Sequence, residues 1–333
     1  MPTITTTLKR LLFIFCKKSI KIISLLFAVS IIAFVLVCAS PVDPVDQYIL
    51  GLGQAVSAEQ RLEIEQYWGT DEPLVDRYLS WLADILRGNL GQSLIYRRLV
   101  SEVIAERFLN SLALMLTSWL LAGIIGFVLG CIMGMYQDRW PDRILKKICY
   151  TLSCIPTFWL GLMLLLVFGV YLRWFPIGFS SPIGVLSSDV TVWQKLYHLI
   201  LPAFTLSLTS FASGALHTRQ KLIEVLGSEY VLFARARGES QLSILFRHGI
   251  RNIILPALTL QFASFAELFG GSVMAENVFS YPGLGSAISS AGLNCDVPLL
   301  LGITLFSTLF VCVGNMITDL LYGVVDPRMG EAR

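Results

Sequence analysis

One acidic residue, Glu267, lies in the middle of an apolar stretch, Ile253–Met274, that is long enough to cross a bilayer. An ionised side chain at that depth costs at least about 2.5 kcal/mol, so this carboxyl group needs water, a partner or a bound group. Two interpretations stay open. The carboxyl group is neutral and hydrogen-bonded to a neighbouring helix, or it lines a polar passage.

A second set of polar side chains lies in the apolar stretch Leu199–Leu216. For any one hydroxyl group, a bond to its own helix is the favoured interpretation, whereas a whole polar stripe favours a passage. Asn315, in the stretch Val297–Val325, poses the same choice between a bond to another helix and a passage. We take Glu267, Ser207, Ser210 and Asn315 as candidate residues of such a passage. The other hydroxyl groups of Leu199–Leu216 are those of Thr205, Thr209 and Ser213.

The segment Ser228–Pro256 lies between two apolar stretches and carries four arginines and a histidine. A basic loop of this kind faces the cytoplasm. Within it, Glu229–Arg237 contains no helix breaker, follows the N-cap candidate Ser228 and stops at Gly238, which predicts a short helix outside the bilayer. Two turns of helix do not fold alone, so this helix suits a groove in a soluble partner. The alternative is a basic loop without a special partner.

Catalytic and metal-binding patterns are missing from the sequence. It contains no Gly-x-x-x-x-Gly-Lys-Ser/Thr phosphate loop, no H-E-x-x-H motif and no serine-hydrolase elbow. The three histidines are scattered, and the seven cysteines include no C-x-x-C pair. We therefore predict no catalytic residue, no metal ligand and no cofactor bound by this chain, which argues against an enzyme.

The composition places the chain in a lipid bilayer. Of its 333 residues 55% are hydrophobic and 14% are charged, whereas an ordinary soluble domain has about 25% charged residues. The net charge of +2 is too small to indicate nucleic-acid binding, and the basic residues lie at the ends of apolar stretches. They orient the chain in the membrane.

The elements that must position these side chains are membrane helices, so the fold class is all-α. The basic residues ahead of the first apolar stretch resemble a secretion signal, but the stretch is too long for one and is expected to be retained. Pro156 removes a backbone hydrogen bond and predicts a kink, with a gating role as the alternative. The six predicted spans are Ile22–Ala39, Leu109–Tyr136, Ile148–Tyr171, Leu199–Leu216, Ile253–Met274 and Val297–Val325.

The connecting segments set the expected topology. Residues 41–107 form an extracytoplasmic loop or subdomain, in which Val75–Leu86 and Leu99–Phe108 have helical spacing. Six spans place both termini in the cytoplasm. Seventeen of the 25 Lys and Arg residues then lie in cytoplasmic segments and two in the short external loops, as the positive-inside rule requires. In the second span four glycines, Gly123, Gly126, Gly130 and Gly134, leave one face small enough for close helix packing.

The sequence SEYVLFARARG, followed by RHGIRNIILP, resembles the coupling loop of ABC importer permeases. The similarity is greatest to the oligopeptide, dipeptide and nickel permeases, whose form is roughly D/E-Y-V-x-x-A-R-A-x-G. Three other stretches, Gly88–Leu112, Glu276–Gly285 and Asp319–Arg328, resemble the same family in the same order. The matching loop positions are Glu229, Tyr230, Val231, Ala234, Arg235, Ala236, Gly238, Arg251, Asn252, Leu255 and Pro256.

This resemblance implies a type I ABC importer permease of the bacterial inner membrane. It implies as partners a similar second permease, giving a heterodimer, two cytoplasmic ATPase subunits that bind ATP and Mg, and an external solute-binding protein. Peptides, nickel or other metal chelates are the implied cargo. The small residues Ala234, Ala236 and Gly238 are expected in the tightest part of the joint with an ATPase. The implied coupling residues are Glu229, Tyr230, Ala234, Arg235, Ala236, Arg237 and Gly238.

Glu267 departs from the family pattern, which mostly has a small or apolar residue there, so it is a candidate for cargo selection. A stand-alone six-span secondary transporter or channel is the competing hypothesis, but it predicts several intramembrane charges and internal repeats. A membrane anchor would leave the loop motif without a purpose. The expected division is 1–40 for tail and first span, 41–107 for the external subdomain, 108–325 for a five-helix core with coupling loop 217–252, and 326–333 for the cytoplasmic tail.

Overall fold

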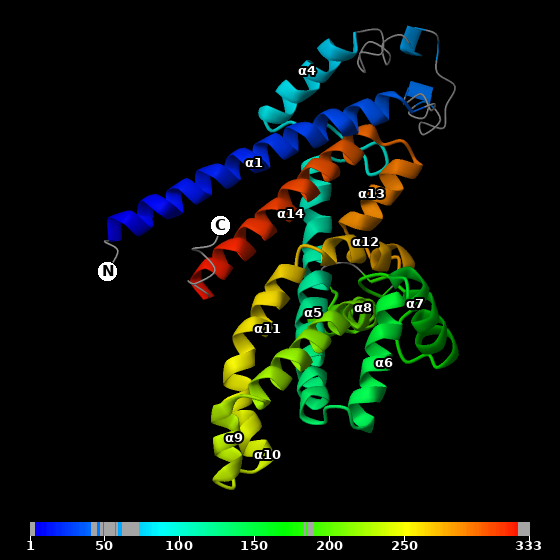
Figure 1. The fold of residues 1–333 in the computed structure, drawn as a ribbon. Helices are drawn as coiled ribbons and strands as arrows, with labels where there is room; N and C mark the ends of the chain where they lie inside the picture. Colours follow the sequence, from blue (N-terminus) through cyan, green and yellow to red (C-terminus); the bar gives the residue numbers. More distant parts are fainter. Residues whose placement is uncertain are drawn as a thin grey trace. The chain divides into compact units, whose positions relative to one another are not determined.

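The computed structural model describes residues 4–40, 45–46, 49, 57, 59–61, 73–182, 184–185 and 189–325 (Figure 1). Over these residues the chain is helical, with one isolated bridge between Gln92 and Leu99 and no strand, which confirms the all-α prediction there. Two compact units are distinguished. Unit 1 comprises Met1–Phe108 and Ala287–Met316, and unit 2 comprises Leu109–Ser286 and Ile317–Arg333.

Within the described part of the chain, four helices are long and apolar enough to cross a membrane. Two bent pairs of helices raise the number of spans to six if each pair counts as one. The six predicted spans agree with this upper number, and the count itself stays a prediction. The four helices are α1 (Ile4–Cys38), α5 (Val100–Met135), α8 (Val192–Leu226) and α14 (Val297–Val325).

The first bent pair confirms the kink predicted at Pro156. Helix α6 (Trp140–Cys154) ends just before this proline, and α7 (Thr157–Leu164) begins just after it. The chain continues from α7 as a short π-helix, Leu165–Tyr171. The two parts meet at 107°, because Pro156 donates no backbone hydrogen bond and restricts the residue before it.

The second bent pair lies where a span was predicted over Ile253–Met274, and its break was not predicted. Helix α11 (Ile250–Ser264) and α12 (Leu268–Val278) meet at 59° across three turn residues. No proline lies at this break. The Gln261 carbonyl accepts instead from Trp119 Nε1 at 2.7 Å and from the Ser264 hydroxyl group at 2.8 Å. Side chains that donate to a backbone carbonyl compete with the backbone hydrogen bonds of the helix and interrupt their regular series.

Helix α8 is the centre of unit 2. A capping box at Thr191 and Gln194 starts it, so it begins seven residues before the predicted span Leu199–Leu216 and ends ten residues after it. The first part of the predicted loop 217–252 is therefore helical. Helices α6, α7, α11 and α12 all pack on α8, and its apolar window is 56% buried, the largest share among the four long helices.

The predicted small face of α5 packs closely on α8. At Gly130 an added Cβ would lie 2.6 Å from Thr218 Cβ and 2.7 Å from the Ala215 carbonyl oxygen. At Gly134 it would lie 2.8 Å from Leu222. Real Cβ atoms do not approach so closely, so glycine is required for this helix contact. The prediction of close packing at these glycines is confirmed.

Unit 1 contains α1, α4 (Leu74–Leu86) and the start of α5, with α13 (Leu284–Leu293) leading into it. The helix predicted over Val75–Leu86 is confirmed as α4, and the one predicted over Leu99–Phe108 is the first part of α5. Asp296, fully buried, accepts from Ser93 Oγ at 2.6 Å and from the Leu299 amide at 3.2 Å. It therefore caps α14 and holds the loop before α5 in place. Much of 41–72 lies outside the described residues.

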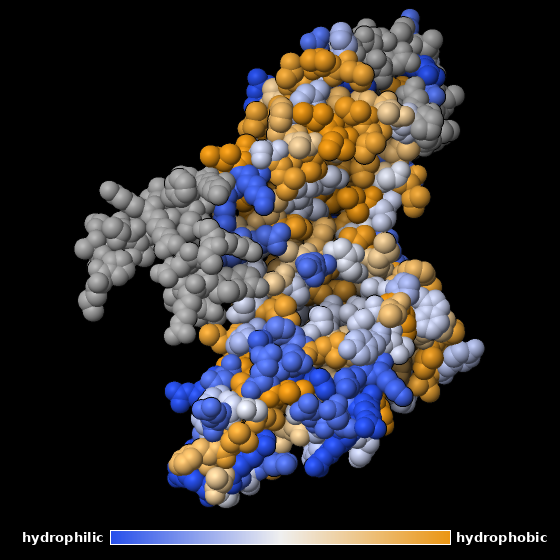
Figure 2. All heavy atoms as spheres, viewed as in Figure 1, coloured by the Kyte–Doolittle hydropathy of each residue, from blue (hydrophilic) through white to orange (hydrophobic). Residues whose placement is uncertain are grey.

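Hydrophilic residues of unit 2 gather at one end of it. Figure 2 shows them over the end that holds the start of α6 and the short helices α9 (Glu229–Ala236) and α10 (Gln241–Ile244), with hydrophobic residues among them. A short π-helix, Leu245–Gly249, joins α10 to α11. Exposed charged residues at this end include Asp138, Arg139, Arg143, Arg235 and Arg237.

Candidate functional site

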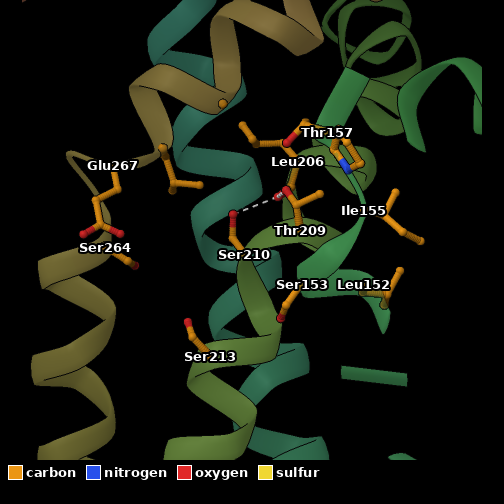
Figure 3. A pocket seen from close by; sticks show the side chains of 13 residues that line it. Leu152, Ser153, Ile155, Thr157, Leu206, Thr209, Ser210, Ser213, Ser264 and Glu267 are labelled. Carbon is orange, nitrogen blue, oxygen red and sulfur yellow. Dashed lines mark hydrogen bonds between the residues drawn. The ribbon is translucent and has the colours of Figure 1, made fainter. Parts of the chain in front are cut away.

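A cavity of about 350 Å³ lies within unit 2, at the breaks of both bent helix pairs. Figure 3 shows its lining from α8, from the α6–α7 break and from the α11–α12 break. Irregular backbone within a membrane is tolerated where it is buried in protein or lines water. The lining residues are Leu152, Ser153, Ile155, Pro156, Thr157, Leu206, Thr209, Ser210, Ser213, Ser264, Glu267, Leu268 and Gly271.

Glu267 is the charged residue of this lining. It is the last residue of the α11–α12 break and directly precedes α12. Its side chain is exposed, and among the described residues no hydrogen bond or ion pair is made to it. Figure 3 places it beside Ser264, with the α8 hydroxyl groups farther along the cavity. The arrangement therefore matches the interpretation in which the carboxyl group faces a polar space, not the one in which it ties two helices together.

The hydroxyl groups of the lining bond to their own helices, as predicted for each one singly. Ser210 Oγ donates to the Leu206 carbonyl at 2.9 Å, and Thr209 Oγ1 donates to the same carbonyl at 3.0 Å. Ser153 and Ser264 make equivalent bonds at 2.9 and 2.8 Å. A hydroxyl oxygen that donates its proton keeps lone pairs that accept hydrogen bonds. The same side chains therefore satisfy the helix and also give the cavity a polar wall.

Two of the candidate passage residues do not line this cavity. Ser207 is fully buried, and its Oγ donates to the Phe204 carbonyl at 2.8 Å, so it contributes nothing to the cavity wall. Asn315 is an exposed residue of α14, in the part of that helix assigned to unit 1. Of the four residues proposed for a passage, Glu267 and Ser210 share one cavity.

The short helix predicted outside the bilayer is α9, and its end follows from Gly238. The Gly238 amide donates to Arg235 O at 2.9 Å and the Glu239 amide to Ala234 O at 3.2 Å. This pair of bonds is a Schellman motif, and Gly238 supplies the left-handed φ of +82° that the motif needs. Ser228 occupies the N-cap position as predicted, but its hydroxyl group donates to the Val225 carbonyl and makes no cap bond.

One face of α9 packs on this chain itself. Val231 and Ala234 are 0% and 4% exposed and contact Ile244 of α10, next to the end of α8. Ala234 therefore faces its own chain, whereas it was expected in the joint with a partner. Phe233 is 66% exposed and Leu232 is 53% exposed. The other predicted coupling residues are all exposed, namely Glu229, Tyr230, Arg235, Ala236, Arg237 and Gly238.

A buried ion pair near α9 was not predicted. Asp142 is fully buried at the start of α6 and accepts from Arg219 Nε at 2.6 Å and from a second Arg219 nitrogen at 2.8 Å. Lys146 lies 3.4 Å away. This bidentate pair joins α6 to the last turns of α8, on which α9 rests. The sequence signal was an acid in the first turn of a helix within an otherwise basic link.

A second buried carboxylate was also missed. Glu276 is 0% exposed and accepts from Ser111 Oγ at 2.6 Å, from the Gly285 amide at 2.7 Å and from the Ser286 amide at 3.1 Å. Ser111 Oγ accepts in turn from the Leu284 amide at 2.8 Å. The two side chains thus satisfy the first amides of α13. The signal was the acid before the Pro-Gly-Leu-Gly turn in ENVFSYPGLG.

The same buried surroundings affect a tyrosine in that turn. Tyr281 is 4% exposed. Burial, with a smaller effect of the Glu276 charge, raises the pKa of Tyr281 to about 12. The phenol is therefore neutral at any physiological pH.

The sequence of this chain matches two family models and is similar to known transport proteins. Residues 126–331 match the model described as the binding-protein-dependent transport system inner membrane component, and residues 11–115 match its N-terminal model. The oligopeptide transport system permease protein AppB of Bacillus subtilis (strain 168) is 34% identical over 314 residues, covering 94% of this chain and 98% of the relative. The glutathione transport system permease protein GsiC of Escherichia coli (strain K12) is 34% identical over 315 residues, covering 94% and 97%.

The chain belongs to this family of inner-membrane transport components. Its role is that of the permease in a binding-protein-dependent ABC importer, which confirms the main hypothesis over a stand-alone transporter or channel. The four long apolar helices and the two bent pairs agree with a membrane permease.

Proposed function

We propose that this chain, together with a second permease subunit, forms a translocation path for peptides. The observation that carries the proposal is the polar cavity at the breaks of two apolar helix pairs, lined by Glu267 and six hydroxyl-bearing residues. A polar space among apolar helices allows a hydrophilic cargo to pass a bilayer. Further support comes from the relatives, whose names assign them to oligopeptide and glutathione transport.

A nickel or metal-chelate cargo is the weaker alternative. Within the described residues no group of three or more His, Cys, Asp or Glu side chains could hold a metal ion. The cavity lining offers one carboxylate and hydroxyl oxygens, without a His or Cys ligand. Soft or borderline metals favour such nitrogen and sulfur ligands. A peptide fits the lining better.

In this proposal α9 couples the path to two ATPase subunits, which bind ATP and Mg. Its apolar outer face, Leu232 and Phe233, is the docking surface, and its inner face transmits force to α8 and α10 through Val231 and Ala234. A helix that shows apolar side chains to a groove is a common mode of recognition. Leu242 and Phe246, which follow α9 in the chain, are exposed as well.

The proposed topology places α9, and with it the hydrophilic end of unit 2, in the cytoplasm. That end carries many arginines, as cytoplasmic segments do. With six spans, both termini lie on the same side as α9. An external solute-binding protein would deliver the peptide to the opposite side.

The test is peptide uptake by the reconstituted complex with Phe233→Ala in this chain. An exposed aromatic anchor contributes about 2 kcal/mol or more to docking, so we expect uptake and copurification of the ATPase subunits to fall roughly thirtyfold. The matched control is Trp140→Ala, because Trp140 is 74% exposed at the same end of unit 2 but lies outside α9. Normal uptake by the Phe233 variant would contradict the docking role, and no peptide uptake by the wild-type complex would contradict the cargo.

A further inference from the structure

We propose that the cavity between the two helix breaks is a binding site for a primary ammonium group, with the Glu267 carboxylate as its counter-charge. The inference rests on the proposed function in one respect, because it identifies the ammonium group with that of a peptide cargo. The chemical argument comes from the cavity wall itself.

The wall is rich in hydrogen-bond acceptors. Four of its hydroxyl groups donate their protons to carbonyls of their own helices at 2.8–3.0 Å, as described above. Their oxygens keep lone pairs directed elsewhere. The hydroxyl groups of Thr157 and Ser213 can donate or accept. Glu267 adds two oxygens that accept when the carboxyl group is ionised.

Cationic and amide side chains are missing from this wall. The thirteen lining residues, all in the described part of the chain, include no Lys, Arg, His, Asn or Gln. An anionic ligand would therefore meet Glu267 without a compensating cationic side chain. A ligand that brings positive charge and several N–H donors matches the wall, and a primary ammonium group brings three donors.

The position of Glu267 is consistent with a carboxylate that pairs with a ligand only while the ligand is bound. The residue lies at a break between two apolar helices, where an ionised group is expensive unless water or a partner compensates it. Among the described residues the structure provides no fixed partner for its side chain. A mobile cation within the path would compensate the charge only while it is bound, which suits a site that must also release its ligand.

An ammonium site would allow one permease to accept peptides of varied sequence. Every unmodified peptide carries one α-ammonium group, whatever its side chains. A single carboxylate with surrounding hydroxyl oxygens recognises that shared group and leaves the rest of the peptide unspecified. The selectivity of the site would thus be for a free amino terminus.

The first test uses a probe that is not a cargo. Ser213 is exposed on α8, lines the cavity and is a suitable place for a thiol. In the assembled complex carrying S213C, iodoacetamide alkylation at position 213 is followed by peptide mass spectrometry. We expect n-butylammonium to slow alkylation several-fold more than neutral n-butanol does at the same ionic strength. Adding E267Q should remove that difference, since a bond to a charged group contributes about tenfold or more in affinity.

Three results of this test would overturn the proposal. They are equal protection by n-butanol, equal protection by potassium ions, and full protection by n-butylammonium in the presence of E267Q. The first indicates a site for apolar groups, the second a site for any cation, and the third a site without Glu267. None of these results depends on whether the importer carries peptides.

The second test asks whether the ammonium site contributes to transport. Uptake of a dipeptide is compared with uptake of its N-acetylated form by complexes with wild-type chain, E267Q or E267D. Because the binding protein is the same throughout, its own preference cancels in the ratio of variant to wild type. We expect E267Q to reduce uptake of the free dipeptide about tenfold and of the acetylated form much less, with E267D between wild type and E267Q.

The control variant is E224Q, which changes an exposed carboxylate of unit 2 that pairs with Lys221 on the surface of α8. It should leave both uptake rates unchanged. An equal loss of both peptides in E267Q, or no loss of either, would overturn the ammonium site while leaving peptide cargo intact. Failure of the wild-type complex to take up either peptide would overturn the proposed cargo and the transport part of this inference together.

Discussion

The two ends of helix α12 carry the same residue type in opposite surroundings. Glu267 directly precedes the helix and is exposed at the cavity, whereas Glu276, in its last turn, is fully buried. Glu276 accepts from one hydroxyl group and two amides, and Glu267 accepts from no described residue. Both are carboxylates of one apolar segment, so hydropathy alone does not separate them.

This difference in burial and hydrogen bonding distinguishes Glu276, which stabilises the fold, from Glu267, which is accessible from the cavity. A buried carboxylate with three donors fixes the position of each donor, and here it fixes the start of α13. An exposed carboxylate without a partner contributes little to the stability of the fold. It can therefore pair with a group that enters the cavity. Three experiments test this contrast, in order of decreasing expected loss of stability.

The first experiment compares Glu276→Ala with Glu267→Ala. Removing Glu276 takes this acceptor from the buried Ser111 hydroxyl group, the buried Gly285 amide and the partly buried Ser286 amide, which costs about 3 kcal/mol or more. We expect a severe loss of folded complex and a lower midpoint of thermal unfolding in detergent. Glu267→Ala should leave yield and midpoint unchanged. Equal stability of the two variants would contradict the claim that Glu276 stabilises the fold and Glu267 does not.

The second experiment asks whether the same contrast holds on α8, where Arg219 and Lys221 are two residues apart. Arg219→Ala leaves the buried Asp142 carboxylate without its bidentate partner, and breaking a buried pair from one side costs about 3–5 kcal/mol before relaxation. Lys221 pairs with Glu224 at the surface, so Lys221→Ala should have little effect.

The measurement for α8 is again the yield and unfolding midpoint of the complex. Lys146 lies 3.4 Å from Asp142 and limits the loss in the Arg219 variant, so we expect it to be smaller than that of Glu276→Ala. A double variant, Arg219→Ala with Asp142→Asn, should recover part of the stability because it removes the unpaired charge. No recovery would indicate that Arg219 acts through packing of its stem.

The third experiment compares two serines. Ser111→Ala removes a donor to Glu276 and the acceptor of the Leu284 amide, at a cost of about 1–3 kcal/mol. Ser264→Ala removes a hydroxyl group whose proton bonds to its own helix, and the change in stability should be under about 0.5 kcal/mol. A larger effect at Ser264 would mean that the bond from Trp119 to the Gln261 carbonyl does not maintain the break between α11 and α12 by itself.

Several local features were predictable from the sequence. Apolar stretches of bilayer length indicated the membrane helices, because the hydrocarbon thickness sets the required length. Pro156 indicated a break and Gly238 the end of α9, since each acts through its own backbone conformation. The family likewise followed from motifs that are contiguous in the chain.

Other features depend on contacts between residues far apart in the chain. The α11–α12 break has no proline, and the Gln261 carbonyl is taken by Trp119, 142 positions away. Ala234 faces inward because α10 and the end of α8 cover that side of α9. In each case a local pattern permits two outcomes, and the neighbouring helix selects one.

The two glutamates of α12 show the same limit. The sequence placed Glu267 in an apolar stretch, where its charge must be compensated, and it predicted no role for Glu276. Contacts in the folded chain distinguish the two carboxylates, because Ser111, 165 positions from Glu276, donates to the Glu276 carboxylate from α5. At Glu267 the break in the helix opens onto a cavity, and no such neighbour is provided there by the described chain. The positions of neighbouring side chains in three dimensions, which spacing along the chain does not encode, therefore separate the residue that stabilises the fold from the one that faces the cavity.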